Sequence, residues 1–205
     1  MRRLSFSDKN FTVDLLENVK NMEVREPTIL LNINDTAAHV DSEILQPLSS
    51  SIFNQVTIPH AGKMISITSV SGFSALESLP DRDRLMKEWT HVHDIFPLPH
   101  LSETKLWRSK KEKIGNVSFN LWFAAAGTDC GIHNEHDFLE IHTQIWGTGH
   151  MQKFHTKDSS TMYEDILMTP GFTHEPFCGQ DHLYPWHRYF ADTDCVWLAV
   201  EWNKQ

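Results

Sequence analysis

The stretch of sequence that decides the fold runs from Gly131 to Gly147 and reads GIHNEHDFLEIHTQIWG. It places three histidines and two glutamates within ten positions. Histidine together with carboxylate is a common ligand set for zinc, iron, manganese or nickel in proteins. The stretch therefore predicts a metal site.

A strand is expected from Asp137 to Trp146, within this stretch. Successive side chains of a strand point to opposite faces, so every second residue shares a face. Glu140, His142 and Gln144 then point in the same direction. If Glu140 faces a cavity, His142 and Gln144 are expected to line that cavity as well.

Bulk composition limits the classes of protein that the chain can represent. Its 205 residues, 40% of them hydrophobic, suffice for one domain, or for one domain with a long extension. Eighteen basic and 27 acidic residues give a formal charge of -9. Because phosphate binding needs a basic face, we expect no nucleic-acid partner.

The three cysteines, Cys130, Cys178 and Cys195, show no CxxC spacing and predict no disulfide framework. A reducing compartment, and hence the cytoplasm, is the expectation. The segment from Met1 to Phe11 lacks the apolar core of a secretory signal. No apolar run approaches the roughly 20 residues of a membrane span, so we expect no membrane partner.

The first half of the chain mixes patterns. A helix is expected over residues 78–95, because Pro80 suits a first helical turn and Leu85, Trp89 and Val92 share one helical face.

Other segments of this half suggest strands and turns. Residues 52–73 indicate strands separated by a turn at residues 59–62, residues 41–45 a helical turn, and residues 49–51 a loop. The run from Arg108 to Lys113 indicates a charged, solvated surface connector.

The second half is rich in strand patterns. Val117, Phe119, Leu121 and Phe123 alternate with polar or small residues, as in a half-buried strand. Further strands are expected at residues 150–156 and 163–168, and a closing hairpin is expected from residues 186–191 and 195–202. Many short strands with frequent turns favour a sandwich or a barrel.

Residues 115–202, approximately, resemble a cupin, a double-stranded β-helix (jelly-roll) barrel. The first cupin motif has a His-x-His pair, a Glu three or four residues later, and a Gly seven residues beyond that Glu. Glu140 and Gly147 match this spacing, and His136 lies four positions before Glu140. The sequence departs from the motif two positions before His136, where Asn134 stands and a histidine, His133, precedes it. A β-bulge at the start of the strand can aim His133 inward as the first ligand. Alternatively, Asn134 is the ligand, or the site has three protein ligands.

The second cupin motif has a Pro-Gly turn ahead of a strand and then a histidine. Pro170 and Gly171 supply the turn, and two histidines compete for the remaining position. His174 follows the turn directly. His187 precedes a turn and a final strand, as in the closing part of the family, and we favour it.

The resemblance implies one divalent transition metal held by His133, His136, Glu140 and His187. Such a set leaves open positions suited to Fe(II), which we favour; Mn, Zn, Ni and Cu have similar ligand preferences. His142, Gln144 and His174 are then expected to orient the substrate or move protons.

The function that follows is a metal-dependent cupin enzyme acting on a small polar molecule, in first place an Fe(II) oxygenase. An isomerase, lyase or decarboxylase of the same fold, or a cupin that binds a small ligand without chemistry, are the alternatives. We expect a mainly β fold, with the barrel and its metal site at residues 111–205 and an α/β extension with one helix at residues 1–110. Cupins commonly pair through their N-terminal side, so a homodimer is expected.

Overall fold

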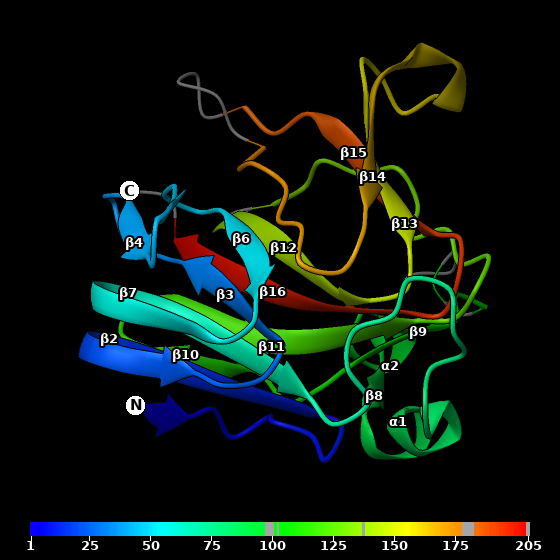
Figure 1. The fold of residues 1–205 in the computed structure, drawn as a ribbon. Coiled ribbons are helices and arrows are strands. Elements are labelled where there is room, and N and C mark those ends of the chain that lie inside the picture. The colour runs from blue at the N-terminus through cyan, green and yellow to red at the C-terminus, as the bar shows by residue number, and fades with distance from the viewer. Residues whose placement is uncertain (97–100, 102, 137, 178–182, 204–205) are drawn as a thin grey trace.

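Antiparallel strands in three sheets make up most of the structure, and only short helices accompany them (Figure 1). The computed structural model describes residues 1–96, 101, 103–136, 138–177 and 183–203. The prediction of a mainly β fold is confirmed.

Sheet A is formed by the N-terminal residues and has the strand order β1-β2-β7-β3-β6, with β4 pairing with β5 and β7. Its strands are β1 (Arg2–Arg3), β2 (Phe11–Val24), β3 (Thr28–Asn32), β4 (Ala38–Val40), β5 (Glu43–Leu45), β6 (Ser50–Phe53) and β7 (Val56–Ser69). The helical turn predicted at residues 41–45 and the loop predicted at 49–51 are therefore wrong for most of their length, because residues 43–45 and 50–51 pair as strands.

The turn predicted at residues 59–62 is also wrong, because β7 continues through it beside β2. Pairs on both sides of Pro59 keep the same register, with Lys20 opposite His60 and Met22 opposite Ile58. Asn21, which lies between those two β2 residues, has a positive φ of 48°. An irregular partner position is where a strand tolerates a proline, which cannot donate a backbone hydrogen bond.

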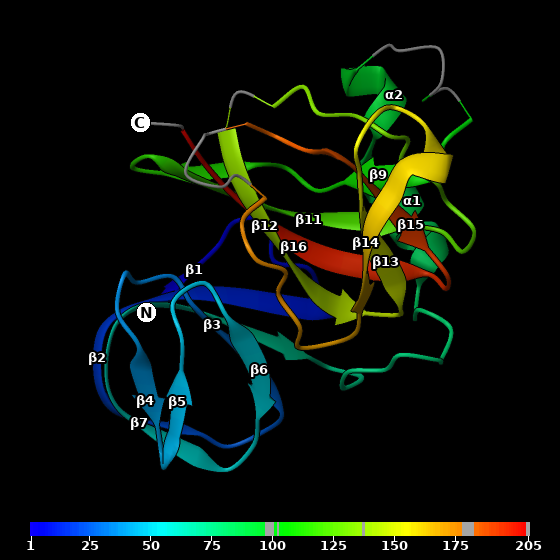
Figure 2. The ribbon, with the colours of Figure 1, turned by 90° about the horizontal axis from the view of Figure 1, so that it is seen from above.

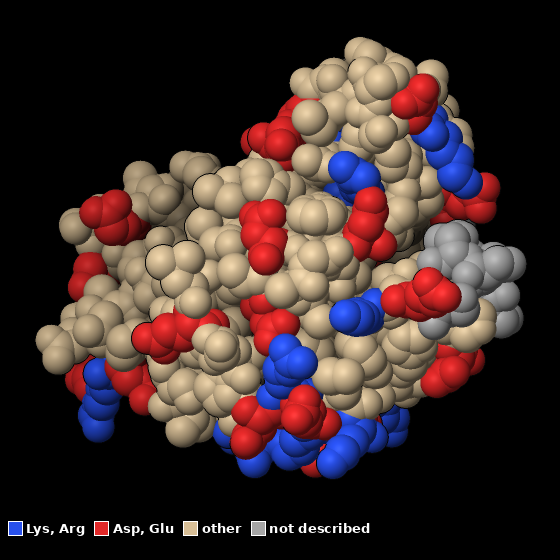
Figure 3. Space-filling view, turned by 90° about the vertical axis from the view of Figure 1, so that its right-hand side faces the viewer, with Lys and Arg blue, Asp and Glu red and all other residues tan. Residues whose placement is uncertain are grey.

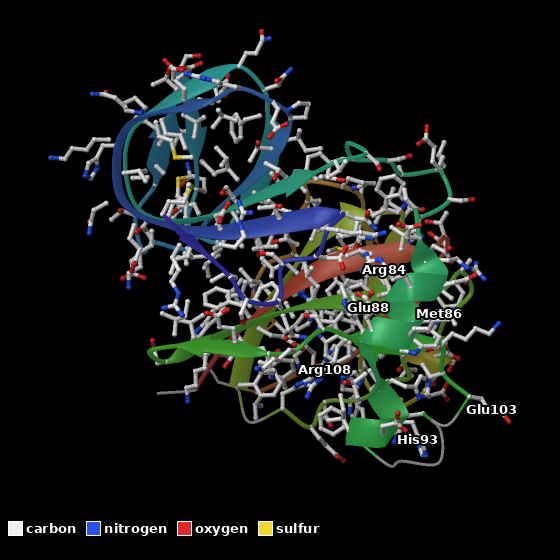
Figure 4. All side chains as sticks on the ribbon, turned by 90° about the horizontal axis from the view of Figure 1, so that it is seen from below. Arg84, Met86, Glu88, His93, Glu103 and Arg108 are labelled. Carbon is white, nitrogen blue, oxygen red and sulfur yellow. The ribbon has the colours of Figure 1, made fainter. Side chains whose placement is uncertain are left out.

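The helix predicted over residues 78–95 is much shorter in the structure. α1 (Arg82–Glu88) begins after Asp81, whose backbone is left-handed, and ends where Trp89 is extended. A two-residue strand, β8 (Thr90–His91), separates it from α2 (Val92–Ile95). Arg84 fixes α1 through Asp8 at 2.6 Å and Glu88 at 2.5 Å. Figure 4 labels Arg84 and Glu88 on this helix.

Sheets B and C form the second half of the molecule. Sheet B has the order β12-β16-β11-β9-β8, with β10 on β11, and sheet C has the order β14-β13-β15. Their remaining strands are β9 (Leu106–Arg108), β10 (Glu112–Ile114), β11 (Val117–Ala124), β12 (Phe138–Trp146), β13 (Gly149–Phe154), β14 (Met162–Met168), β15 (Trp186–Ala191) and β16 (Cys195–Asn203). Sheet B thus draws strands from both sides of residue 110.

The last two strands do not form the predicted closing hairpin. β15 pairs with β13 in sheet C, whereas β16 lies between β12 and β11 in sheet B. The turn at residues 192–194 was recognisable in the sequence, but it carries the chain from one sheet to the other. Consecutive strands that alternate between two facing sheets are typical of a jelly roll.

Both faces of sheet B are covered by other parts of the protein. Residues at alternate positions of its strands are apolar, and the residues between them are buried as well. Its outer face packs on sheet A, and its inner face looks toward sheet C (Figure 1). The outer-face core includes Leu15, Ile29, Leu31, Ile65, Ile67, Phe119, Leu121, Phe123, Ile141, Leu198 and Val200. A fully buried side chain of this size contributes about 1.5–3 kcal/mol.

A further core lies within sheet A itself, where Leu16, Leu30, Ile58 and Met64 are fully buried. Figure 2 shows the strands around it, β4, β5 and β6 with the bent ends of β2 and β7, standing beside the other two sheets. Sheet A therefore has a core of its own in addition to the core that it shares with sheet B, and two short helices follow it in the chain.

The surface that carries α1 has no single sign of charge, since Lys and Arg side chains lie among Asp and Glu side chains there (Figure 3). Within the described residues, no helix has the length and apolar character that crossing a membrane requires.

Candidate metal centre

The loop before β12 is held against β15 by a short bridge between His133 and His187. Each backbone N–H of the pair donates to the carbonyl of the other, at 3.0 and 2.9 Å. The bridge brings the two imidazole rings to 4.4 Å between centroids. Residues 54 positions apart are thereby placed side by side at one end of sheet C.

Both imidazoles are oriented by backbone carbonyls. Nδ1 of His133 lies 2.9 Å from the carbonyl oxygen of Gly131, and Nδ1 of His187 lies 3.0 Å from that of Pro185. A carbonyl only accepts, so Nδ1 carries the hydrogen and Nε2 keeps its lone pair. This carbonyl-anchored tautomer is the one in which metal-binding histidines are commonly held.

His136 and Glu140 complete the cluster. One ring nitrogen from each of His133, His136 and His187 lies within 4.8 Å of the others. Oε1 of Glu140 is 3.7 Å from Nε2 of His136 and 3.9 Å from Nε2 of His187. The four residues predicted as ligands are therefore together, and this donor set suits a divalent transition metal.

His133 contributes its side chain to this cluster, and Asn134 is not among the described residues that line the adjoining cavity. The predicted bulge at the strand start is not how His133 reaches it. β12 begins at Phe138, so His133 and His136 both precede the strand and are aimed by the loop and its bridge to β15. Asp137, the predicted first residue of the strand, lies outside the described residues.

The protonation states of the cluster suit metal binding. Burial raises the pKa of the Glu140 carboxyl, but attraction to His142, His136 and His187 outweighs burial and holds that pKa well below its usual range. Burial, followed by repulsion from His133, lowers the pKa of His187 to about 3. At neutral pH the carboxylate is thus ionised and the His187 imidazole neutral, as ligands must be.

His142 lies on the same face of β12 as Glu140, as predicted from strand alternation. Its Nε2 is 3.2 Å from Oε2 of Glu140, the oxygen that does not face His136 and His187. Its Nδ1 is buried and has no hydrogen-bond partner among the described residues. His142 therefore connects the cluster to the adjoining cavity.

The cavity between sheets B and C has a volume of about 690 Å³. The cluster residues lie in its wall, and aromatic and aliphatic side chains form most of the rest. Lining residues beyond the cluster include Arg108, Lys111, Trp122, Met151, Trp197 and Glu201. A partly enclosed, mostly apolar space beside a group of ligands is typical of a small-molecule site.

Gln144 lies one step farther along the inner face and is not among the described residues that line the cavity. Its Oε1 accepts a hydrogen bond of 2.8 Å from the hydroxyl of Tyr189, which does line the cavity. Its Nε2 donates to the carbonyl of Trp146 at 2.8 Å. The expectation that Gln144 lines the cavity is wrong. Gln144 lies behind the cavity wall, where its side chain supports Tyr189.

His174 is separated from the three clustered histidines. It is 1% exposed, and Nε2 accepts a hydrogen bond of 3.0 Å from the backbone N–H of His142. Its Nδ1 lies 2.7 Å from the carbonyl oxygen of Glu175. Burial, followed by repulsion from His142, lowers the pKa of His174 to about 3, so the ring is neutral. Of the two histidines that compete for the second motif, His187 is the one in the cluster.

The expectation of a solvated connector at Arg108–Lys113 is wrong for Arg108, Ser109 and Lys111. Arg108 and Lys111 line the cavity, and Ser109 is buried. The short strands β9 and β10 edge sheet B here, so alternate side chains turn inward. A run of charged residues gives no sequence sign of alternation between inward and outward side chains. Leu106 and Trp107, just before the run, do suggest a buried edge strand.

Cys130 lines the cavity, and burial raises the pKa of its thiol, which stays protonated. Cys195 is buried on β16, and Cys178 lies outside the described residues. The Cys195 Sγ is 3.0 Å from the carbonyl oxygen of Thr148.

No protein-family model and no curated protein matches the sequence. Several solved structures match part of the chain at low sequence identity. An ectoine synthase from P. lautus is 14% identical, with a TM-score of 0.40 over 62% of this chain and 78% of that one. An RmlC-like cupin from Desulfovibrio desulfuricans is 16% identical, with a TM-score of 0.36 over 48% and 82%.

An oxalate oxidase in complex with the substrate analogue glycolate is 16% identical, with a TM-score of 0.38 over 51% of this chain. The match spans about half of that protein, 54% of its length. Several of these similar structures are cupins, the superfamily that residues 115–202 resemble.

Proposed function

We propose that the protein is a metal-dependent cupin enzyme that acts on a small polar molecule. The observation that carries the proposal is the convergence of three imidazole nitrogens within 4.8 Å, beside the buried Glu140 carboxylate, in the wall of a cavity. A partly enclosed, mostly apolar site of this kind strengthens electrostatic interactions with a bound substrate.

His133, His136, Glu140 and His187 would hold the metal. A divalent metal bound there supplies Lewis-acid chemistry and, if it is iron, one-electron redox chemistry. We favour Fe(II), and hence an oxygenase, because four protein ligands leave open positions on an octahedral ion. An isomerase, lyase or decarboxylase would use the same ligands.

The neighbouring side chains have distinct tasks in this proposal. His142 gives its Nε2 hydrogen to Glu140, and its ring lines the cavity, where it would orient a substrate group beside the metal ligands. Gln144 and His174 act indirectly. Gln144 fixes the Tyr189 hydroxyl, and His174 fixes the backbone of His142.

Metal analysis of the full chain purified without chelator tests the proposal. We expect a transition metal close to stoichiometry, lost on dialysis against a chelator and restored by Fe(II), Mn(II), Zn(II), Ni(II) or Cu(II). Protein loaded with Fe(II) should bind nitric oxide and give the electron paramagnetic resonance signal of a high-spin iron–nitrosyl. A negligible metal content, together with no binding of any of these ions, would contradict the proposal.

We further propose that the protein is a cytoplasmic homodimer with a small-molecule substrate as its partner. The support is the small number of cysteines, of which Cys130 and Cys195 are free, and the resemblance to a family that commonly pairs. Analytical ultracentrifugation tests the assembly, and a mass equal to one 23.7 kDa chain would contradict it.

A further inference from the structure

The inner face of sheet B carries a second group of polar side chains, away from the metal cluster. Strand pairing aligns Trp197 of β16 with Trp122 of β11, and Trp122 with Arg108 of β9. Two strands, β16 and β11, separate β9 from β12, which carries Glu140. With strands about 4.8 Å apart, this places β9 about 14 Å from β12 across the sheet.

Arg108 is a cation without a matching anion. Among the described residues, no carboxylate lies within ion-pair distance of its guanidinium, which stands 5.8 Å from the Trp122 ring and 5.6 Å from the Phe96 ring. Burial lowers the pKa of Arg108, although Glu201 partly opposes this. Figure 4 shows Arg108 on the side of the molecule where α2, with His93, lies.

The carboxylate whose charge acts on Arg108 is already engaged. Glu201 Oε2 accepts from the Nζ of Lys111 at 2.5 Å. Lys111 and Glu201 therefore compensate each other, and the positive charge of Arg108 is left without an ion pair among the described residues. Arg108 is half-buried, and a partly desolvated charge that no partner compensates is costly, so a functional reason for it is expected.

Hydrogen-bond donors without acceptors lie on the neighbouring strands β11 and β16. The indole Nε1 atoms of Trp122 and Trp197 are buried and have no hydrogen-bond partner within the described part of the chain. An indole N–H can only donate, so each of them lacks an acceptor. The amide of Asn120, two positions before Trp122 on the same face of β11, is fully buried and equally unpartnered. Buried polar groups in native proteins are rarely left unsatisfied without a role.

We propose that Arg108, Trp122 and Trp197 form a subsite for a carboxylate group of the substrate, at the end of the cavity remote from the metal cluster. The inference rests on the proposed function for the identity of its ligand as a substrate. A guanidinium binds a carboxylate through two parallel hydrogen bonds, and the Trp122 and Trp197 rings, which line the same cavity, flank the group that Arg108 holds. The single uncompensated cation matches a monoanion, which favours a carboxylate over a doubly charged phosphate.

The substrate class is thereby narrowed to a small organic acid. Its acidic group is held near Arg108, and its reacting end extends toward His142 and Glu140. The stacked pair of Trp122 and Trp197, with ring planes 2° apart, offers a flat apolar wall between the two ends.

Binding of benzoate and its neutral analogue benzamide to the full chain tests the subsite. Ligand-detected NMR titrations give the dissociation constant of each probe. Benzoate should bind the parent protein at millimolar concentrations, and benzamide at least about tenfold more weakly, because a charge-assisted hydrogen bond is lost. Equal affinities for the two probes, or no binding of benzoate, would overturn the subsite.

Variants locate the binding. Arg108→Gln should weaken benzoate binding by at least about tenfold and leave benzamide binding within about twofold. Lys157→Gln is the matched control, because it removes one positive charge from an exposed residue at the cavity rim, and it should change neither probe. Arg108→Lys keeps the charge and should lose less affinity than Arg108→Gln. Unchanged benzoate binding in Arg108→Gln would refute the assignment.

Two further measurements distinguish failure of the subsite from failure of the proposed function, and a carboxylate site from a phosphate site. Benzoate should bind chelator-treated protein as it binds untreated protein, so an absence of metal leaves the subsite result intact. Conversely, protein that binds metal but not benzoate would overturn the subsite alone. Phenyl phosphate that binds through Arg108 more tightly than benzoate would overturn the choice of a carboxylate.

Discussion

Glu140 and Glu201 occupy directly paired positions on β12 and β16, and both carboxylates are buried against the same cavity. Their partners differ. Glu140 lies among imidazoles, and Glu201 pairs with the Lys111 ammonium at 2.5 Å. Two chemically identical side chains, one strand apart, are thus assigned to a metal site and to a structural ion pair.

Glu140→Ala should lower the affinity for Zn(II) or Fe(II) by at least about 100-fold, since removal of a supporting partner alone costs up to about that much. The fold should persist, because the loop bridge between His133 and His187 is made by the backbone. Metal titration against a competing chelator, with circular dichroism as the check on folding, measures both effects.

Glu201→Gln is the matched control for this prediction. It alters a carboxylate at the paired position and should keep metal affinity within about tenfold of the parent, since Glu201 is not among the clustered ligands. Equal metal affinities in Glu140→Ala and the parent would contradict the assignment of Glu140.

His187→Ala and His174→Ala should fail in different ways. His187→Ala removes one of the three clustered nitrogens and should cost at least about 100-fold in metal affinity. His174→Ala leaves the cluster intact but deprives the His142 N–H and the Glu175 carbonyl of their partner. We expect it to lower the free energy of unfolding by about 2–4 kcal/mol, as for a lost buried hydrogen-bonded side chain.

Chemical denaturation and metal titration of the two variants, performed side by side, distinguish these outcomes. If His174→Ala lost metal as completely as His187→Ala at unchanged stability, His174 would be a ligand in solution and the separation of the two histidines would be incorrect.

Much of the metal cluster could be predicted from the sequence because its chemistry is concentrated in one stretch. Glu140 and His142 share a face because β12 is regular through both residues, and strand alternation holds there. Gln144 follows the same alternation, yet the depth of a side chain depends on the facing sheet. Only the structure shows that Tyr189 of β15 covers it.

Sequence patterns fail where a feature depends on distant strands. The turn at residues 192–194 is visible in the sequence, but the partners of β15 and β16 are set by β13, β11 and β12. Arg108 is a related case, because a charged run predicts solvent until pairing with Trp122 of β11 turns its side chain inward. Local propensity cannot contain this information.

Tyr189→Phe should destabilise the protein by about 1–3 kcal/mol, because the buried Gln144 Oε1 would lose its donor. Burial raises the pKa of Tyr189 well above its usual value, so the phenol is protonated at neutral pH and donates in the parent. Denaturant unfolding of Tyr189→Phe and of the double variant Tyr189→Phe, Gln144→Leu measures the effect. The double variant should recover part of the loss, since an unsatisfied polar atom is removed; a further loss equal to the first would contradict this pairing.

Gly147 closes the stretch that carries the cluster, and its role is steric. Its φ is 72°, and a Cβ at this position would overlap the carbonyl oxygen of Asp194 and the Oγ1 of Thr193. The close approach is required because Thr148 and Thr193 are joined by a hydrogen bond of 2.9 Å. This hydrogen bond joins the turn after β12 to the turn at residues 192–194, which connects sheet C to sheet B.

Gly147→Ala should therefore lower the free energy of unfolding by about 3–5 kcal/mol, the sum of a left-handed backbone penalty and an overlap that only backbone movement can relieve. Gly127→Ala is the matched control. Gly127 also has a positive φ, 77°, but a Cβ there would meet nothing within 4 Å, so only the backbone penalty of about 1 kcal/mol applies. Thermal and urea unfolding of the two variants give the difference. Equal losses would mean that the glycine of the motif serves backbone conformation alone, and that the contact between the two turns is looser than the structure places it.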